Sequence, residues 1–204
     1  MNILAIGAHP DDIEFGCGGT LIRHAQKGDK VFILVLTSGE IGGDPGSRKC
    51  EQEKAAHFMK AKKVFWGDFK DTEVPRDRTA ITTIEEVIRR VKPQTVLFNY
   101  LADIHQDHRA LAHAALSATR YIREVLFYEV PSTQSFEPDV FVDITKVMDK
   151  KLKLLKIHCS QVHKTRVENL SILESAKSCA IFRGFQGRVK YAEGFKALRI
   201  LKEI

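Results

Sequence analysis

Short, continuous apolar runs alternate with longer segments of helical periodicity along this chain of 204 residues. The runs NILAIGA and KVFILVLT have the length and composition of strands that are covered on both faces. Further strands are expected at 64–69, 95–100, 124–130 and 140–144. Because helical segments separate most of these strands, the pattern predicts an α/β fold with a mostly parallel sheet and helices on both faces.

The helical segments carry their own start and stop signals. The first is expected to begin within residues 16–19 and to end just before Gly28, which suits the left-handed position after a helix. A helix near 81–91 places Thr83 and Glu86 at the spacing of a capping box. The other helices are expected at 48–61, at about 108–120, and as two segments between about 145 and 181.

Composition is that of an ordinary globular protein, with 44% apolar and 28% charged residues. Without a linker, repeat or low-complexity tract, residues 1–204 are expected to form a single domain. No apolar run approaches the roughly 18 residues of a membrane span, and MNILAIGA lacks the basic start of a signal peptide. We therefore expect a cytoplasmic protein with four reduced cysteines that share no metal or redox role, namely Cys17, Cys50, Cys159 and Cys179.

The formal net charge of +6 permits binding to nucleic acids or other anions. However, basic residues stand in mixed-sign surroundings such as RKCEQEK and IEEVIRRVK, and no basic block is interleaved with aromatic residues. We therefore expect no nucleic-acid partner and interpret most of these charges as a solvated surface. A preference for anionic substrates is the alternative.

Two polar clusters follow predicted strands directly. HPDDIE comes after the first strand, and DIHQDH comes after the fourth. In open parallel sheets, ligands bind beyond the carboxyl ends of the strands, at the point where the strand order reverses. If the first and fourth strands are neighbours, the two clusters meet in one crevice.

The clusters contain the donors of an open metal site. His9 and Asp12 stand three apart across a proline turn and can face one point, and His108 supplies a second imidazole. Two histidines and one carboxylate, with no fourth protein ligand, describe a Zn²⁺ site that leaves a position for water, although Fe²⁺ or Co²⁺ also suits these donors. Such a metal lowers the pKa of water toward about 7 and polarises a carbonyl, which favours hydrolysis.

Neighbouring residues fit the remaining roles of a hydrolase. Adjacent residues on a turn point in different directions, so Asp11 is free to act as the general base beside the ligand Asp12. His105 is expected to stabilise the oxyanion or to protonate the leaving amine. We expect Asp107 to hold His105 as the imidazolium.

AHPDDIEFGCGGT matches the signature A-H-P-D-D-x-E-x-x-x-G-G-T of the zinc-dependent N-acetylglucosaminyl deacetylases, the LmbE-like or PIG-L-like family. DIHQDHRA resembles the second motif of this family, and FVDIT, HCSQ and YAEGF resemble patterns in its carboxyl half. The resemblance therefore covers nearly the whole chain. It implies a Rossmann-like fold, metal ligands His9, Asp12 and His108, the base Asp11, and His105 assisted by Asp107.

The same resemblance implies an enzyme that removes an acetyl or similar short acyl group from an amino sugar or its conjugate. It implies a small-molecule substrate and a homo-oligomer, and it places Arg48 near the substrate. Asp103 stands where some members carry tyrosine. The loops at 39–47 and 68–79 are expected to contact the substrate, but they carry no readable specificity code.

Other interpretations of these residues stay open at this stage. The turn histidine and aspartates can serve as a structural turn and helix cap. Glu14 is expected to have a structural role, and Gly16, Gly18 and Gly19 are expected to permit close helix packing, because their spacing is not that of a dinucleotide-binding loop. His158, in HCSQ, is the further histidine that can approach the site.

Two other functional classes also fit part of the pattern. One is a non-haem Fe(II) enzyme with a 2-His-1-carboxylate site, although such enzymes are all-β proteins. The other is a non-catalytic module that binds a sugar or nucleotide. A binding module would tolerate Asp11→Asn, whereas a deacetylase would not.

Overall fold

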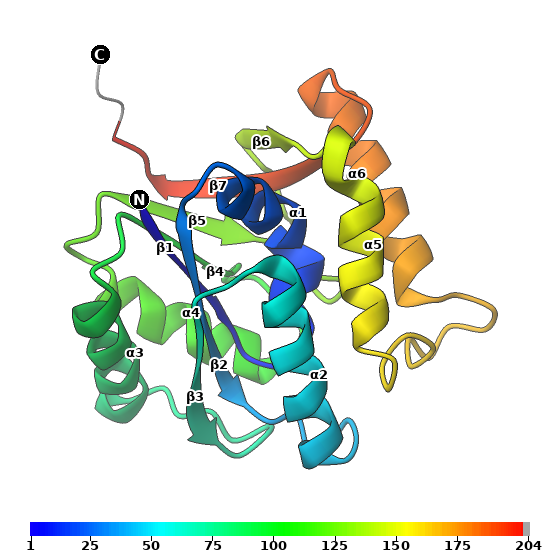
Figure 1. The fold of residues 1–204 in the computed structure, drawn as a ribbon. Helices are drawn as coiled ribbons and strands as arrows, with labels where there is room; N and C mark the ends of the chain where they lie inside the picture. Colours follow the sequence, from blue (N-terminus) through cyan, green and yellow to red (C-terminus); the bar gives the residue numbers. More distant parts are fainter. Residues whose placement is uncertain (202–204) are drawn as a thin grey trace.

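The computed structural model describes residues 1–201, whose centre is one seven-stranded sheet (Figure 1). Its strands are β1 (Asn2–Gly7), β2 (Lys30–Thr37), β3 (Lys63–Phe69), β4 (Thr95–Asn99), β5 (Glu124–Tyr128), β6 (Val140–Asp143) and β7 (Ala192–Arg199). They lie in the order β3-β2-β1-β4-β5-β7-β6. The first five strands of this order pair in parallel, and β7 is antiparallel to both β5 and β6. The predicted fold class is confirmed.

Helices cover both faces of the sheet, and each face has its own apolar core (Figure 1). One face carries α1 (Asp12–Gln26), α2 (Pro45–Met59), α5 (Met148–Ile157) and α6 (Ile172–Gly187). The other carries α3 (Arg78–Val91) and α4 (Gln106–Ala118). A short 3-10 turn, η1 (Thr145–Val147), precedes α5. A sheet covered in this way explains the continuous apolar runs of its central strands.

The first and fourth strands are neighbours, as the convergence of the two polar clusters requires. β1 pairs with β4 in parallel, from Ile3 opposite Thr95 to Ile6 opposite Phe98. The strand order reverses between these two strands, because β2 and β3 extend to one side and β5 to the other. The loop after β1 and the loop after β4 therefore leave the sheet side by side, at the position where such folds bind ligands.

Helix α1 begins at Asp12, so the expected start within residues 16–19 is wrong. The glycines lie inside the helix because neighbouring elements approach it too closely for side chains. A Cβ on Gly16 would lie 2.1 Å from Cδ2 of Tyr128, and one on Gly18 would lie 2.9 Å from Cδ2 of Leu154. A Cβ on Gly19 would meet Ile144 at 2.9 Å. This finding agrees with the interpretation that the glycines permit close packing.

The predicted capping box at Thr83 and Glu86 is also wrong. α3 begins at Arg78, and the side chain of Asp77 accepts a hydrogen bond of 2.7 Å from the Thr79 amide. Thr83 lies inside the helix, where its hydroxyl donates to the Thr79 carbonyl. Thr83 and Glu86 have the spacing of a capping box but lie inside the helix.

Strand β7 was not among the expected strands. Its sequence, AEGFKALR, includes a glutamate, a glycine and a lysine within four positions, which is untypical of a buried strand. The first half of the strand is nevertheless buried, and Glu193 is only 4% exposed. The polar side chain is tolerated because it has partners that lie far away in the sequence.

Glu193 and Lys151 insert a buried ion pair into the middle of α1. The Glu193 carboxylate accepts from the amides of Gly19 and Thr20 at 2.8 and 2.7 Å. The Lys151 ammonium donates to the Phe15 carbonyl at 2.5 Å and lies 2.5 Å from the same carboxylate. The Phe15 carbonyl and the Gly19 amide are the groups that an uninterrupted helix would join. The pair therefore connects α5 and β7 to the helix that carries the first polar cluster.

Two further expectations concern the whole chain. Among residues 1–201, no helix has both the length and the apolar character needed to cross a bilayer. The four cysteines are free thiols, as expected.

Replacing Gly16 by alanine should destabilise the protein by about 1–3 kcal/mol, because overpacking against Tyr128 outweighs the helix propensity gained. Gly46→Ala is the matched control, since a Cβ there meets only Asp44 Oδ2 at 3.4 Å. That variant should be neutral or stabilised. Urea unfolding of both variants measures the difference, and equal midpoints would contradict the proposed packing role.

Glu193→Gln should destabilise the protein by about 3–5 kcal/mol, because it leaves the buried Lys151 ammonium without a counter-charge. Glu137→Gln, on the exposed surface, makes the same chemical change and should have little effect. Adding Lys151→Met to Glu193→Gln should recover part of the loss. Chemical denaturation checks all three variants, and no difference between the two glutamine variants would refute the assignment.

Candidate metal centre and active site

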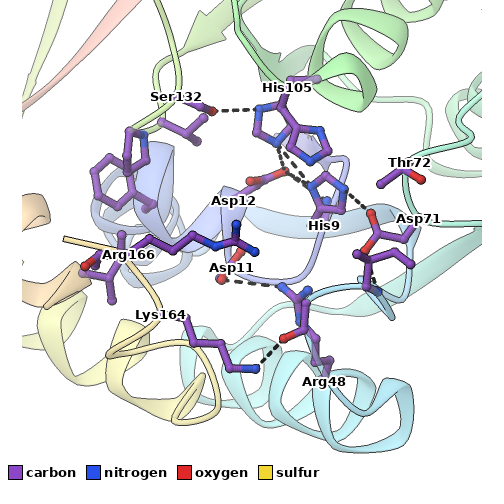
Figure 2. A pocket seen from close by; sticks show the side chains of 18 residues that line it. His9, Asp11, Asp12, Arg48, Asp71, Thr72, His105, Ser132, Lys164 and Arg166 are labelled. Atoms are coloured by element: carbon purple, nitrogen blue, oxygen red, sulfur yellow. Dashed lines mark hydrogen bonds and ion pairs between the residues drawn. The ribbon is translucent and has the colours of Figure 1, made fainter. Parts of the chain in front are cut away.

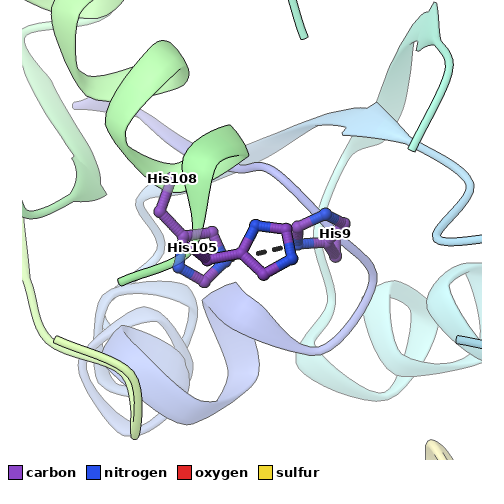
Figure 3. Close-up of side chains that lie close together, drawn as sticks. All are labelled: His9, His105 and His108. Carbon is purple, nitrogen blue, oxygen red and sulfur yellow. Dashed lines mark hydrogen bonds between the residues drawn. The ribbon is translucent and has the colours of Figure 1, made fainter. Parts of the chain in front are cut away.

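His9, Asp12 and His108 converge on one point, as the sequence predicted. Figure 2 shows His9 beside Asp12, and Figure 3 shows His9 beside His108. His9 Nδ1 lies 3.2 Å from His108 Nε2. Asp12 Oδ2 lies 3.2 Å from His108 Nε2 and 3.7 Å from His9 Nδ1. Tetrahedral coordination with bonds of about 2.0–2.1 Å separates ligand atoms by about 3.3 Å. The three donor atoms therefore already have the spacing of one face of a tetrahedral metal site.

The start of α1 holds Asp12 in place. Its Oδ2 accepts hydrogen bonds of 3.0 Å from the amides of Ala8 and His9, in the turn that leaves β1. Burial alone would raise the pKa of Asp12, but His108 and His9 outweigh burial and hold this pKa well below its usual value. Asp12 is therefore a carboxylate with a fixed orientation, as a metal ligand must be.

The second nitrogen of His9 faces two more carboxylates. Nε2 lies 3.0 Å from Asp71 Oδ1 and 3.2 Å from Asp107 Oδ2. Burial lowers the pKa of His9, but Asp107, Asp12 and Asp71 together raise it well above its usual value. A carboxylate behind a histidine fixes the ring orientation and raises its basicity as a ligand.

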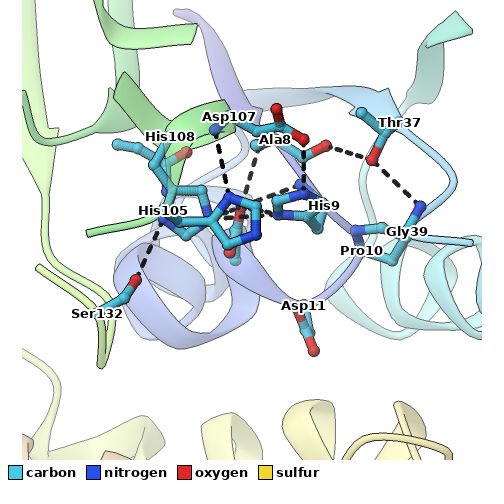
Figure 4. Close-up of polar contacts among 12 residues, drawn as sticks. Ala8, His9, Pro10, Asp11, Thr37, Gly39, His105, Asp107, His108 and Ser132 are labelled. Atoms are coloured by element: carbon cyan, nitrogen blue, oxygen red, sulfur yellow. Dashed lines mark hydrogen bonds and ion pairs between the residues drawn. The ribbon is translucent and has the colours of Figure 1, made fainter. Parts of the chain in front are cut away.

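Asp107 therefore has different partners from those expected. Its carboxylate faces His9 and accepts from the amides of Thr72 and Val74, at 2.7 and 3.3 Å. Its contact with His105 is made by the backbone, whose amide donates to His105 Nδ1 at 3.2 Å (Figure 4). The expected contact between the Asp107 carboxylate and the His105 imidazole is therefore wrong.

His108 is supported by a carboxylate that sequence reasoning did not assign. Asp103 Oδ2 lies 3.1 Å from His108 Nδ1, and it accepts a hydrogen bond of 3.0 Å from the Thr133 hydroxyl. Burial lowers the pKa of His108, but Asp12 and Asp103 raise it to about 9. The position of Asp103 just after β4 was a usable signal. For Asp71 the only signal was its place in the expected 68–79 loop.

His105 lies over the other two rings, with its centroid 4.6 Å from that of His9 and 4.8 Å from that of His108 (Figure 3). Burial, and then the charges of His9 and His108, lower the pKa of His105. The Asp107 amide, not its carboxylate, faces His105 Nδ1, which contradicts the expectation that Asp107 holds His105 as the imidazolium. Because Nδ1 accepts the Asp107 amide hydrogen, the neutral ring carries its proton on Nε2.

Asp11 points away from the imidazoles, on the side of the cavity where Arg48 lies (Figures 2 and 4). Its backbone has φ 96°, a left-handed conformation that is costly for a residue other than glycine. This backbone conformation directs the Asp11 carboxylate away from the Asp12 carboxylate (Figure 2). Burial raises the pKa of Asp11 to about 6, against the opposing charges of Arg48 and His158.

Arg48 connects the loop after β1 with the loop after β2. Its guanidinium donates to the Gly39 and Pro10 carbonyls, each at 2.7 Å, and lies 3.6 Å from Asp11 Oδ2. The residue is only 5% exposed, so its main contacts are with the protein. Its expected contact with the substrate stays a prediction.

Glu14 and His158 are buried next to each other, and the charge of His158 acts on Asp11. Glu14 Oε1 accepts from Gln52 Nε2 at 2.7 Å, and Glu14 Oε2 lies 3.5 Å from His158 Nε2. Burial lowers the pKa of His158, whereas Glu14 and Asp11 raise it, and the net shift is upward. Glu14 thus has the structural surroundings expected for it, and His158 does approach the site.

A cavity of about 400 Å³ opens over the three proposed metal ligands, Asp11 and His105 (Figure 2). Both predicted loops line it, 39–47 through Ile41 and Gly42 and 68–79 through Asp71 and Thr72. Residues 130–132 and 164–166, which sequence reasoning did not assign to the site, also line the cavity. Grouped histidines and carboxylates at the base of such a cavity can bind a metal ion and activate water beside it.

Comparisons with known proteins agree with this chemistry. The family described as PIG-L, GlcNAc-PI de-N-acetylase, matches residues 4–119. YaiS, an uncharacterized deacetylase of Escherichia coli, is 39% identical over 167 residues, which are 78% of this chain and 90% of that protein. The diacetylchitobiose deacetylase of Thermococcus kodakarensis is 30% identical over 225 residues, covering 95% of this chain and 82% of that protein.

A solved structure shows that the same fold also serves another reaction. The 4-carboxy-2-hydroxymuconate hydratase of Pseudomonas putida superposes with a TM-score of 0.85 at 25% identity, covering 100% of this chain and 99% of that one. A hydratase adds water to its substrate and cleaves no amide. The fold therefore does not determine the substrate.

Proposed function

The chain belongs to the PIG-L family of GlcNAc-PI de-N-acetylases, and on that premise we propose that it removes an N-acetyl or similar short acyl group from an amino sugar or its conjugate. The observation that carries this proposal is the convergence of His9 Nδ1, His108 Nε2 and Asp12 Oδ2 at the base of the cavity. The named deacetylases among its relatives support the amide bond as the target.

We propose His9, Asp12 and His108 as the ligands of one divalent ion, with Zn²⁺ favoured and Fe²⁺ or Co²⁺ as alternatives. The donor set supports this choice, because zinc suits mixed nitrogen and oxygen ligands at tetrahedral spacing. When bound, the ion supplies a water of lowered pKa and polarises the substrate carbonyl. Asp71, Asp103 and Asp107 would keep the two imidazoles oriented.

Asp11 is the proposed general base. Its carboxylate lines the same cavity as the three proposed ligands, on the side of Arg48, and its raised pKa suits proton transfer near neutral pH. We propose that it takes a proton from the attacking water and returns one to the leaving amine. His105 would donate its Nε2 hydrogen to the carbonyl oxygen as charge develops there. In this role His105 acts as a neutral donor.

Three other features remain proposals. The free cysteines are consistent with a reducing, cytoplasmic location. Assembly into a homo-oligomer and contact of Arg48 with the substrate stay predictions. The alternatives also stay testable: a binding module would release no amine, whereas a non-haem Fe(II) oxygenase would consume oxygen.

His108→Ala should remove both bound metal and amine release, because it deletes one of three ligands. His113→Ala, an exposed histidine of the same helix, is the matched control and should retain both. Metal analysis of purified protein, with chelation and Zn²⁺ add-back, measures the effect. Full metal content in His108→Ala would exclude this residue as a ligand.

Asp11→Asn should keep the metal and lower kcat by at least about 100-fold, because the amide cannot accept a proton. Amine release from N-acetylglucosamine and diacetylchitobiose is the assay, run beside metal analysis of the same sample. Near-normal turnover would refute the role of Asp11 as base. Loss of the metal would instead assign Asp11 to the metal site.

A further inference from the structure

We propose that Arg166 forms an anion subsite in the cavity, so that the substrate carries a carboxylate or phosphate group away from its scissile amide. This inference rests on the proposed function and specifies its substrate class. Arg166 lies in the loop between α5 and α6 and lines the same cavity as the candidate metal ligands. Figure 2 shows its guanidinium extending into that cavity from this loop.

Within residues 1–201, Arg166 is the one fully ionised group of the cavity wall with no hydrogen-bonded or ionic partner. The other two cationic residues are engaged, Arg48 by two backbone carbonyls and Lys164 by the Gly42 carbonyl at 2.5 Å. The three wall carboxylates also have partners: Asp11 lies by Arg48, Asp12 by His108, and Asp71 by His9. One planar donor group is left for a ligand.

The loop is built to hold this side chain over the cavity. Lys164 and Gln161 both donate to the Gly42 carbonyl, which ties the loop to the expected 39–47 segment. The Thr165 hydroxyl donates to the Leu170 carbonyl at 2.7 Å and so closes a turn around Arg166. Arg166 itself has φ 58°, a conformation that is costly away from glycine. Arg166 is solvent-exposed at the cavity wall, so its guanidinium is accessible to a ligand that enters the cavity.

The charges of the cavity are separated in the way that such a substrate requires. The carboxylates and histidines that would bind the metal come from the loops after β1 and β4 and from the 68–79 segment. Lys164 and Arg166 come from the loop after α5. A guanidinium presents a planar fork of donors that matches a carboxylate or phosphate. An amino sugar with its acyl group at the metal would thus direct an anionic substituent toward Arg166.

Arg166→Gln tests this subsite, with Arg90→Gln as the matched control. Arg90 is exposed near the carboxyl end of α3, next to the start of β4. It therefore lies at the amino ends of the parallel strands, whereas the cavity lies at their carboxyl ends. Three substrates are compared: methyl N-acetylglucosaminide, its carboxymethyl analogue, and N-acetylglucosamine 1-phosphate. Arg166→Gln should raise KM for at least one of the two anionic substrates by about tenfold, with little change in kcat.

KM for the neutral methyl glycoside should be unchanged in both variants, and Arg90→Gln should match the parent on all three substrates. The two anionic substrates show which group the subsite binds. A larger rise in KM for the carboxymethyl analogue indicates a carboxylate, and a larger rise for N-acetylglucosamine 1-phosphate indicates a phosphate. Equal KM values for Arg166→Gln and the parent on both anionic substrates would overturn the inference.

A binding measurement separates this inference from the proposed function. Glucose 1-phosphate and methyl glucoside carry no acyl group, and calorimetry measures their binding to the parent and both variants. Weaker binding of glucose 1-phosphate to Arg166→Gln alone supports the subsite, even if no substrate releases amine and the proposed reaction fails. Carboxymethyl glucoside is titrated in the same way, and unchanged binding of both this carboxylate and glucose 1-phosphate would reject the subsite, whatever the outcome of the amine assay.

Discussion

The site depends on the parallel pairing of β1 with β4, which brings together two motifs that lie about half the chain apart. Their register aligns Ile6 with Phe98, so the loops that follow these strands begin at the same level. Tyr128 of β5 reinforces this edge, because its hydroxyl donates to the Ile6 carbonyl at 2.8 Å and lies 3.0 Å from Asn99 Oδ1. The same tyrosine ring occupies the space that Gly16 leaves open. Strand pairing, helix packing and the placement of the ligands are therefore one connected arrangement.

The fold accepts unfavourable local features around this arrangement. Asp11 has a left-handed backbone, and several carboxylates and imidazoles are removed from water. The buried charges of Asp12 and Asp107 are paired with imidazoles and with backbone amides. Unpaired burial would cost several kcal/mol per group, so the network must be nearly complete for the protein to fold. The same requirement fixes the orientation of the donors.

Specificity has a different structural origin from the reaction chemistry. The family includes named deacetylases, and a hydratase shares the fold, so the scaffold is compatible with more than one substrate. The proposed ligands stand on the turn after β1 and on the first turns of α1 and α4, which strand pairing positions, whereas much of the cavity wall comes from loops. Loops tolerate sequence change better than the core does, and binding residues can vary there without disturbing the sheet. Arg166 is in such a loop.

The sequence by itself determined the alternation of strands and helices, the fold class, and the residues that gather at the strand ends. These properties follow from local periodicity and from order along the chain, which a one-dimensional pattern contains. Only the tertiary structure decided that Asp107 faces His9, that Asp103 supports His108, and that the α1 glycines lie inside a helix. It also brought Glu193 to the Gly19 amide across 174 positions. Such contacts depend on how layers pack against each other, and residues distant in sequence carry no local signal of them.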